Sequence, residues 1–216
     1  MPTREEAEEN LRVIRSLMER ATIYRAISAP VALAGGLASL LGCAIVATSL
    51  PLSTTEPLAT ALFFFGIWIG VLAVTVLTNI FFLWKESSGR GEPFLSPGMR
   101  AAVCALAPCW LVAAILTGFW LKIPWLLPIF WMILYGLGLL ATRYFAPRSI
   151  VLLGWAFVAG GLLSLLIFSG THRDDHVAEL RAANLAMGAT FGLFHLVYAA
   201  CTWPRKSIPT TPGPEP

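Results

Sequence analysis

Long apolar runs separated by short polar clusters dominate this chain. Each run is close to the ~20 residues that a helix needs to cross ~30 Å of hydrocarbon. None alternates with period two, and each must satisfy its own backbone hydrogen bonds in lipid, so the pattern predicts helices rather than barrel strands. We therefore expect an all-α transmembrane six-helix bundle over residues 27–203. Its predicted spans are Ile27–Leu50, Leu58–Trp84, Ala101–Leu121, Trp125–Thr142, Ile150–Ser169 and Ala183–Trp203.

Composition agrees with a lipid environment. Hydrophobic residues make up 57% of the 216 and charged residues 12%, whereas soluble domains carry roughly 25% charged residues. Little mass remains outside the membrane, so we expect the lipid bilayer as a partner and no separate catalytic domain. The net charge of +3 comes from basic residues spread over loop ends, which argues against nucleic acid as a partner. The cysteines fall in apolar runs without a CxxC pair, which predicts buried small side chains.

The distribution of basic residues predicts the orientation. Twelve of the 15 lysines and arginines fall on one side of the predicted spans, and Lys122, Arg173 and Arg181 fall on the other. Because the basic side of a membrane protein faces the cytoplasm, both termini are predicted to be cytoplasmic. The segment Thr171–Ala182 is predicted to face the exterior as a loop.

The two ends of the chain differ from the spans. Residues 1–26 form a predicted amphipathic cytoplasmic arm, with Leu11, Ile14, Met18 and Ala21 on one side of a helix. Such an arm binds a protein partner, mediates self-association or lies on the bilayer surface; alternatively it is a solvated helix that leads into the first span. Residues 204–216 are proline-rich and predicted to be disordered.

A resemblance appears at the end of the arm. The run Leu11–Leu40 reads LRVIRSLMERATIYRAISAPVALAGGLASL. It resembles the N-terminal signature of a group of small, uncharacterised bacterial polytopic membrane proteins, in which LRxIRxxMERA leads into a first span rich in glycine and alanine. The resemblance implies a location in the bacterial inner membrane, and it carries over no catalytic or binding residue.

A similar short pattern occurs twice. Residues 34–40 read AGGLASL and residues 159–165 read AGGLLSL. Small residues let membrane helices approach closely, so both segments are predicted to be helix-packing faces.

One polar segment has the composition of a metal site. His172, Asp175, His176 and Glu179 are spaced i, i+3, i+4 and i+7, so they share one face if a helix begins near Thr171. Two imidazoles and two carboxylates are ligands that zinc and other divalent metals accept. The alternative is a helix start, with a capping box and solvated side-chain pairs. No other cofactor is predicted.

The sixth span carries the second candidate site. His195 is the only ionisable residue deep in a span apart from tyrosine and cysteine, and such residues are functional candidates by default. Asn184, His195 and Tyr198 form the predicted intramembrane polar site, with Thr75, Thr78 and Asn79 of the second span as expected partners. Alternatively, His195 joins helices by a hydrogen bond to a backbone carbonyl or a polar side chain. The full stripe is Asn184, Gly188, Phe191, His195, Tyr198 and Thr202.

These features favour a protein without enzymatic activity. Six spans with a histidine in the last are similar to rhomboid proteases, but the fourth span lacks a serine and a GxSG motif, and the chain has no HExxH motif. Two interpretations remain. A sensor or regulatory membrane subunit would read pH or metal at the exterior segment and bind a partner through the arm, which accounts for both charged segments. The alternative is a small transporter or channel, including one for a metal ion, with its polar site on the sixth span.

Overall fold

The computed structural model describes residues 3–6, 8–11, 13, 28–49, 57–90, 97–119, 125–144, 146–169 and 176–203. Every regular element within these ranges is a helix, which confirms the all-α expectation for them. Residues 4–6, 8–11 and 13 of the arm are helical, while 14–27 and the tail 204–216 lie outside the described residues. The named helices are α2 (Ala29–Ser49), α3 (Pro57–Arg90), α4 (Pro97–Phe119), α5 (Leu126–Ala141), α6 (Arg148–Ser169), α7 (His176–Met187), the π-helix η1 (Gly188–Phe194) and α8 (His195–Thr202).

Within the described residues, five helices are long and apolar enough to cross a membrane, which supports a transmembrane protein. Four of them are the helices α2, α3, α4 and α6, and the fifth is the continuous run Val177–Thr202 through α7, η1 and α8. Helix α5 is equally apolar but has 16 residues. At 1.5 Å per residue it is about 24 Å long, shorter than the ~30 Å hydrocarbon core.

Two helix boundaries differ from the sequence-based expectation. Helix α3 continues beyond Trp84 to Arg90, because no proline interrupts the chain before Pro93. Helix α7 begins at His176 rather than Ala183, so the prediction of a loop through residue 182 was wrong for 176–182. Alanine, leucine and arginine favour the helix there, and Glu179 in the first turn is stabilised by the helix dipole.

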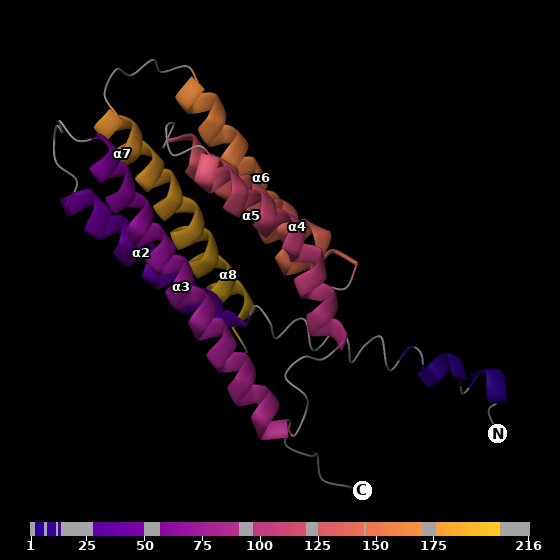
Figure 1. The fold of residues 1–216 in the computed structure, drawn as a ribbon. Coiled ribbons are helices and arrows are strands. Elements are labelled where there is room, and N and C mark those ends of the chain that lie inside the picture. Colours follow the sequence, from indigo (N-terminus) through magenta and orange to yellow (C-terminus); the bar gives the residue numbers. More distant parts are fainter. Residues whose placement is uncertain are drawn as a thin grey trace, which may run out of the picture.

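The helices form two groups with the last helix between them (Figure 1). Helix α2 packs against α3 and against each of α7, η1 and α8. Helix α5 packs against α4 and α6. The run α7–η1–α8 contacts both groups, since α7 also packs on α5, and both η1 and α8 pack on α6. The last helix is therefore positioned to join the two halves of the bundle.

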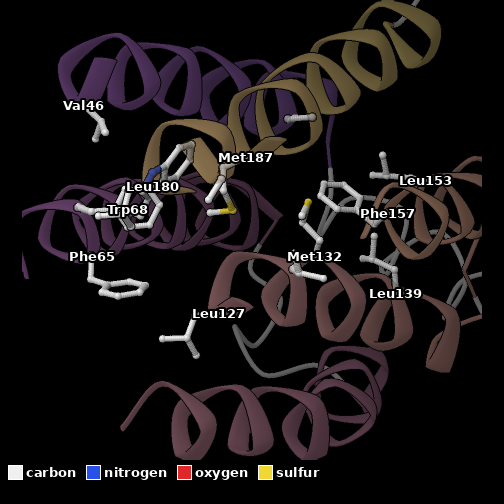
Figure 2. Packing of buried hydrophobic residues seen from close by; sticks show 14 of the residues in the cluster. Val46, Phe65, Trp68, Leu127, Met132, Leu139, Leu153, Phe157, Leu180 and Met187 are labelled. Carbon is white, nitrogen blue, oxygen red and sulfur yellow. The ribbon is translucent and has the colours of Figure 1, made fainter. Parts of the chain in front are cut away.

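The buried side chains follow this arrangement. Figure 2 shows Trp68 of α3 beside Leu180 of α7 in one half, and Phe157 of α6 near Met132 of α5 in the other. Phe157 and Met132 are both fully buried, and Leu180 is 1% exposed. One continuous hydrophobic cluster includes all of these residues.

Both glycine-rich segments lie at helix crossings, which confirms their prediction as packing faces. A Cβ on Gly36 of α2 would lie 3.0 Å from the carbonyl oxygen of Gly192 in η1. A Cβ on Gly161 of α6 would lie 2.6 Å from the Ile133 side chain of α5. Both helices thus depend on the missing side chain to approach their neighbours.

Candidate functional site

The last span contains a long π-helical segment immediately before its histidine. Residues Gly188–Phe194 form η1, and α8 begins at His195. π-Helical turns are rare and occur frequently at functional sites, because the wider turn changes the direction in which the following side chains point. The local structure therefore singles out His195.

His195 is held by two hydrogen bonds inside the bundle and is 8% exposed. Its Nδ1 lies 2.9 Å from the carbonyl oxygen of Phe191 in the preceding turn, and its Nε2 lies 2.9 Å from the hydroxyl of Tyr135 in α5. A carbonyl oxygen only accepts, so Nδ1 carries the proton. In the neutral ring, Nε2 then accepts a hydrogen bond from Tyr135, which links α8 to α5 across the bundle.

Aromatic rings enclose the His195–Tyr135 pair. Phe157 of α6 lies at the centre, with ring-centroid distances of 4.7 Å to Tyr135, 4.8 Å to Phe191 and 5.4 Å to His195. Phe194 packs on Phe157 at 5.5 Å. Edge-to-face and tilted ring pairs at these distances are attractive beyond their buried area. The pair is thus surrounded by apolar surface, where a hydrogen bond has no competition from water.

Asn184 forms a second polar junction, on the α2–α3 side of the last helix. Its side chain is 1% exposed and accepts a hydrogen bond from Trp68 Nε1 of α3 at 3.2 Å. Its Nδ2 donates to the carbonyl oxygen of Cys43 in α2 at 2.9 Å, and the Cys43 thiol lies 3.5 Å from the Asn184 carbonyl oxygen. One side chain therefore connects three helices.

Thr190 of η1 makes a third contact with a neighbouring helix. Its hydroxyl lies 3.1 Å from the Met132 sulfur of α5 and 2.8 Å from the carbonyl oxygen of Ala186 in its own helix. Tyr198, one turn after His195, is buried at 6% exposure.

The structure places the predicted intramembrane residues in two groups. Asn184 bonds to α2 and α3, whereas His195 bonds to α5, and no hydrogen bond between the two groups occurs within the described residues. Their separation of 11 residues is about 16 Å along a helix. Asn184 and His195, predicted to share one face of the last helix, therefore belong to separate hydrogen-bond networks.

The expected partners of His195 on the second span were wrong. Tyr135 of α5 bonds to His195 instead, while Thr75 donates to the Val71 carbonyl of its own helix. The buried Oδ1 of Asn79 has no hydrogen-bond partner within the described part of the chain. The available signal for Tyr135 was a lone tyrosine in an otherwise apolar span, which needs a partner for its hydroxyl.

The predicted metal ligands fall mostly outside the described residues. His172 and Asp175 lie there, as does the side chain of His176. Glu179 is described, half-buried in the first turn of α7. No group of three or more His, Cys, Asp or Glu residues with the geometry of a metal site occurs within the described ranges. The metal site thus stays a prediction.

No protein-family model, curated protein or solved structure matches this chain. The functional argument therefore rests on its own residues: the buried junctions at His195 and Asn184, the arm and the charged ends of the helices.

Proposed function

We propose that this chain is a non-enzymatic sensor or regulatory subunit of the bacterial inner membrane, which binds a protein partner through its N-terminal arm. In this proposal α5 completes a six-span bundle and both termini lie in the cytoplasm. The bundle acts as a scaffold that fixes the arm at the membrane. An external signal, metal or pH, is read at the segment around residues 172–179.

The observation that carries the proposal is the use of the buried polar side chains in the last span. Asn184, Thr190 and His195 are three buried polar residues of this helix, and each bonds to a neighbouring helix. An active site or a transport path needs such groups directed at a substrate. Here they join helices, which supports a structural bundle whose function lies at its ends.

The described part of the arm supports a role in binding. Its helix is exposed, with one ion pair between Arg4 Nε and Glu8 Oε1 at 3.0 Å. Leu11, the first residue of the predicted apolar face, is 66% exposed, so the bundle does not cover it. An amphipathic helix binds into a groove on another protein through its apolar face, and we assign that role to the predicted apolar face of this arm, of which Leu11 is the described residue.

Site-specific photocrosslinking tests the arm in the intact chain. A photoreactive amino acid replaces Leu11 in bacterial membranes, with the same amino acid at Glu5 as the matched control on the polar side. We expect a discrete protein adduct from position 11 and a weaker one from position 5. A free peptide of residues 1–26 should compete for the position 11 adduct in a dose-dependent manner, and Met18→Glu should abolish it.

Two results would contradict the partner proposal. Adducts with lipid alone would place the arm on the bilayer surface. Equal labelling at both positions, insensitive to the peptide, would indicate a solvated helix that only leads into the first span.

The sensing part has a separate test. Metal content is measured by mass spectrometry on the purified chain, wild type beside a His172→Ala/His176→Ala variant. Stoichiometric zinc or another divalent metal in the wild type and its loss in the variant are the expected results for metal sensing. Absence of metal from both proteins would favour the helix-capping interpretation of that segment and leave pH as the signal.

Transport remains the second candidate because of η1. π-Helical segments occur frequently at functional sites, and Gly188 and Gly192 within η1 allow a close crossing with α2 that a movement would alter. Reconstituted vesicles with an internal zinc-sensitive dye test this function. Zinc entry that His195→Phe removes would favour the transporter, whereas no entry above that of empty vesicles would exclude zinc transport.

A further inference from the structure

Three arginines lie at the ends of three adjacent helices. Arg100 is in the first turn of α4, Arg143 follows α5, and Arg148 is the first residue of α6. All three side chains are exposed. None of these three arginines forms an ion pair with another described residue. The Arg4–Glu8 ion pair lies in the N-terminal arm and involves none of them.

Helix packing brings Arg100 to the same level as the other two. Trp131 of α5 donates to the hydroxyl of Thr117 in α4 at 2.9 Å. A Cβ on Gly138 of α5 would lie 3.0 Å from the Leu106 side chain of α4. These contacts define an antiparallel register between the helices. Extended by one and a half turns, that register brings the first turn of α4, with Arg100, to the level of the corner between α5 and α6.

The corner itself is fixed by hydrogen bonds. Thr142 Oγ1 donates to the Leu139 carbonyl, and the amide of Ala146 donates to the Thr142 carbonyl at 2.8 Å. The amide of Ile150 donates to the Pro147 carbonyl at 3.0 Å. The backbone therefore holds the positions of Arg143 and Arg148 on either side of a short turn.

An aromatic side chain orients one of the three guanidinium groups. Arg143 donates from Nη2 to the Tyr144 hydroxyl at 2.6 Å, and its Cζ lies 4.6 Å from the centre of the Tyr144 ring. Tyr144 is 76% exposed at the end of an apolar helix. Tyrosines in such positions sit among the lipid headgroups, so Arg143 is held at headgroup depth.

We propose that Arg100, Arg143 and Arg148 form a binding site for the headgroup of an anionic phospholipid. Guanidinium groups bind phosphate oxygens in a two-pronged geometry that a lysine does not reproduce. Basic sites between helix ends recognise anionic headgroups for this reason. A zwitterionic headgroup presents its own positive charge to the same arginines and binds more weakly. This inference requires a membrane-embedded bundle but is independent of the arm and its partner.

The test is lipid binding to the full chain in a neutral detergent, followed by native mass spectrometry. Phosphatidylglycerol, phosphatidylcholine and free glycerol phosphate are titrated separately. We expect phosphatidylglycerol to bind in preference to phosphatidylcholine. Each Arg→Gln substitution should weaken phosphatidylglycerol binding by about fivefold, as expected for the contribution of one basic residue at a membrane surface.

Lys85→Gln supplies the matched control. Lys85 is exposed near the end of α3 and carries the same charge, but it belongs to the other half of the bundle. It should leave the preference for phosphatidylglycerol within twofold of wild type. An equal loss in Lys85→Gln and Arg143→Gln would overturn the site in favour of a nonspecific charge effect.

Two further results would also overturn the proposal. An R100Q/R143Q/R148Q variant that keeps wild-type preference would remove these residues from lipid binding. Binding of glycerol phosphate as strong as that of phosphatidylglycerol would identify a soluble phosphate ligand instead. Because circular dichroism of the variant is recorded in the same preparation, a folding defect is separated from a loss of binding.

Discussion

The last span packs against its two neighbouring groups by different means. On the side of α2, the approach depends on missing side chains: a Cβ on Gly188 would lie 2.6 Å from the Cys43 sulfur, and one on Gly192 would lie 2.6 Å from the Leu40 side chain. On the side of α5 and α6, large rings fill the interface, with Phe157 in contact with Tyr135, Phe191, Phe194 and His195.

The polar junctions differ in the same way. On the α2–α3 side, Asn184 makes several hydrogen bonds, including one to a backbone carbonyl that has no freedom to move away. On the α5 side, His195 makes a single bond to the end of a tyrosine side chain. The first interface is closely fitted around backbone, whereas the second is made of side chains that can repack. We expect different responses to substitution on the two sides.

The largest effect is expected from Phe157→Ala in the aromatic interface. Phe157 is fully buried, and its removal leaves a cavity that four neighbouring rings line, so the free energy of unfolding should fall by about 3 kcal/mol or more. Reversible unfolding by SDS in mixed micelles measures this loss of unfolding free energy. Phe81→Ala is the control, since Phe81 is 54% exposed on α3 and should change stability little. Similar losses for the two variants would show that the rings do not form a packed interface.

Asn184→Ala should have the next largest effect. It leaves the Trp68 N–H without its acceptor in an apolar interior and removes the second hydrogen bond to the Cys43 carbonyl, which costs about 2 kcal/mol of unfolding free energy. The same unfolding assay measures this loss. A double-mutant cycle with Trp68→Phe isolates the contribution of the hydrogen bond between the Trp68 indole N–H and Asn184. Thr48→Ala is the control, because Thr48 is exposed and bonds only to carbonyls of its own helix. A coupling energy near zero in the cycle would remove the Trp68–Asn184 bond as a contributor to stability.

Gly36→Ala tests the close approach on the α2 side. The added Cβ would lie 2.9 Å from Leu196 and 3.0 Å from the backbone oxygen of Gly192, so the helices must move apart at a cost of about 1 to 2 kcal/mol. Gly66→Ala is the matched control, since a Cβ there meets nothing within 4 Å. The control should be neutral or slightly stabilising, because alanine favours the helix. Equal stability of both variants would mean that the crossing is not tight.

The smallest effect is expected from Tyr135→Phe. It removes one interhelical hydrogen bond, and such bonds contribute on average about 0.6 kcal/mol in membrane proteins. A more direct measurement is the ¹⁵N chemical shift of His195 Nε2. In Tyr135→Phe it should move towards the value of an unprotonated imidazole nitrogen that accepts no hydrogen bond. Phe130→Tyr, elsewhere on α5, controls for a general change in the helix. An unchanged Nε2 resonance in Tyr135→Phe would contradict the bond.

Most of the helices were predictable because each depends on its own residues. Apolar length and proline positions located α2, α4 and α6 to within a few residues. The start of α7 was missed because charged residues were interpreted as a loop, although Glu179 at a helix start is favourable. The glycine-rich packing faces were also predictable, since a glycine pair in an apolar span lets a neighbouring helix approach closely.

The sequence also singled out His195 and Asn184, because a buried polar residue in an apolar run must find a partner. It did not identify Tyr135 or Trp68 as those partners, since they lie 60 and 116 residues away along the chain. Nor did it predict η1, because α- and π-helical turns share nearly the same residue preferences and differ through neighbouring helices.

The sequence alone determined the class of protein and its apolar helices, since these follow from hydrophobicity, length and the need of each segment to satisfy its own backbone in lipid. Only the tertiary structure decided that α2 faces the last span through glycines and that α5 and α6 face it through aromatic rings. The reason is physical: lipid accepts any apolar face, so the choice of neighbour depends on the fit of side chains between helices, which no local pattern encodes.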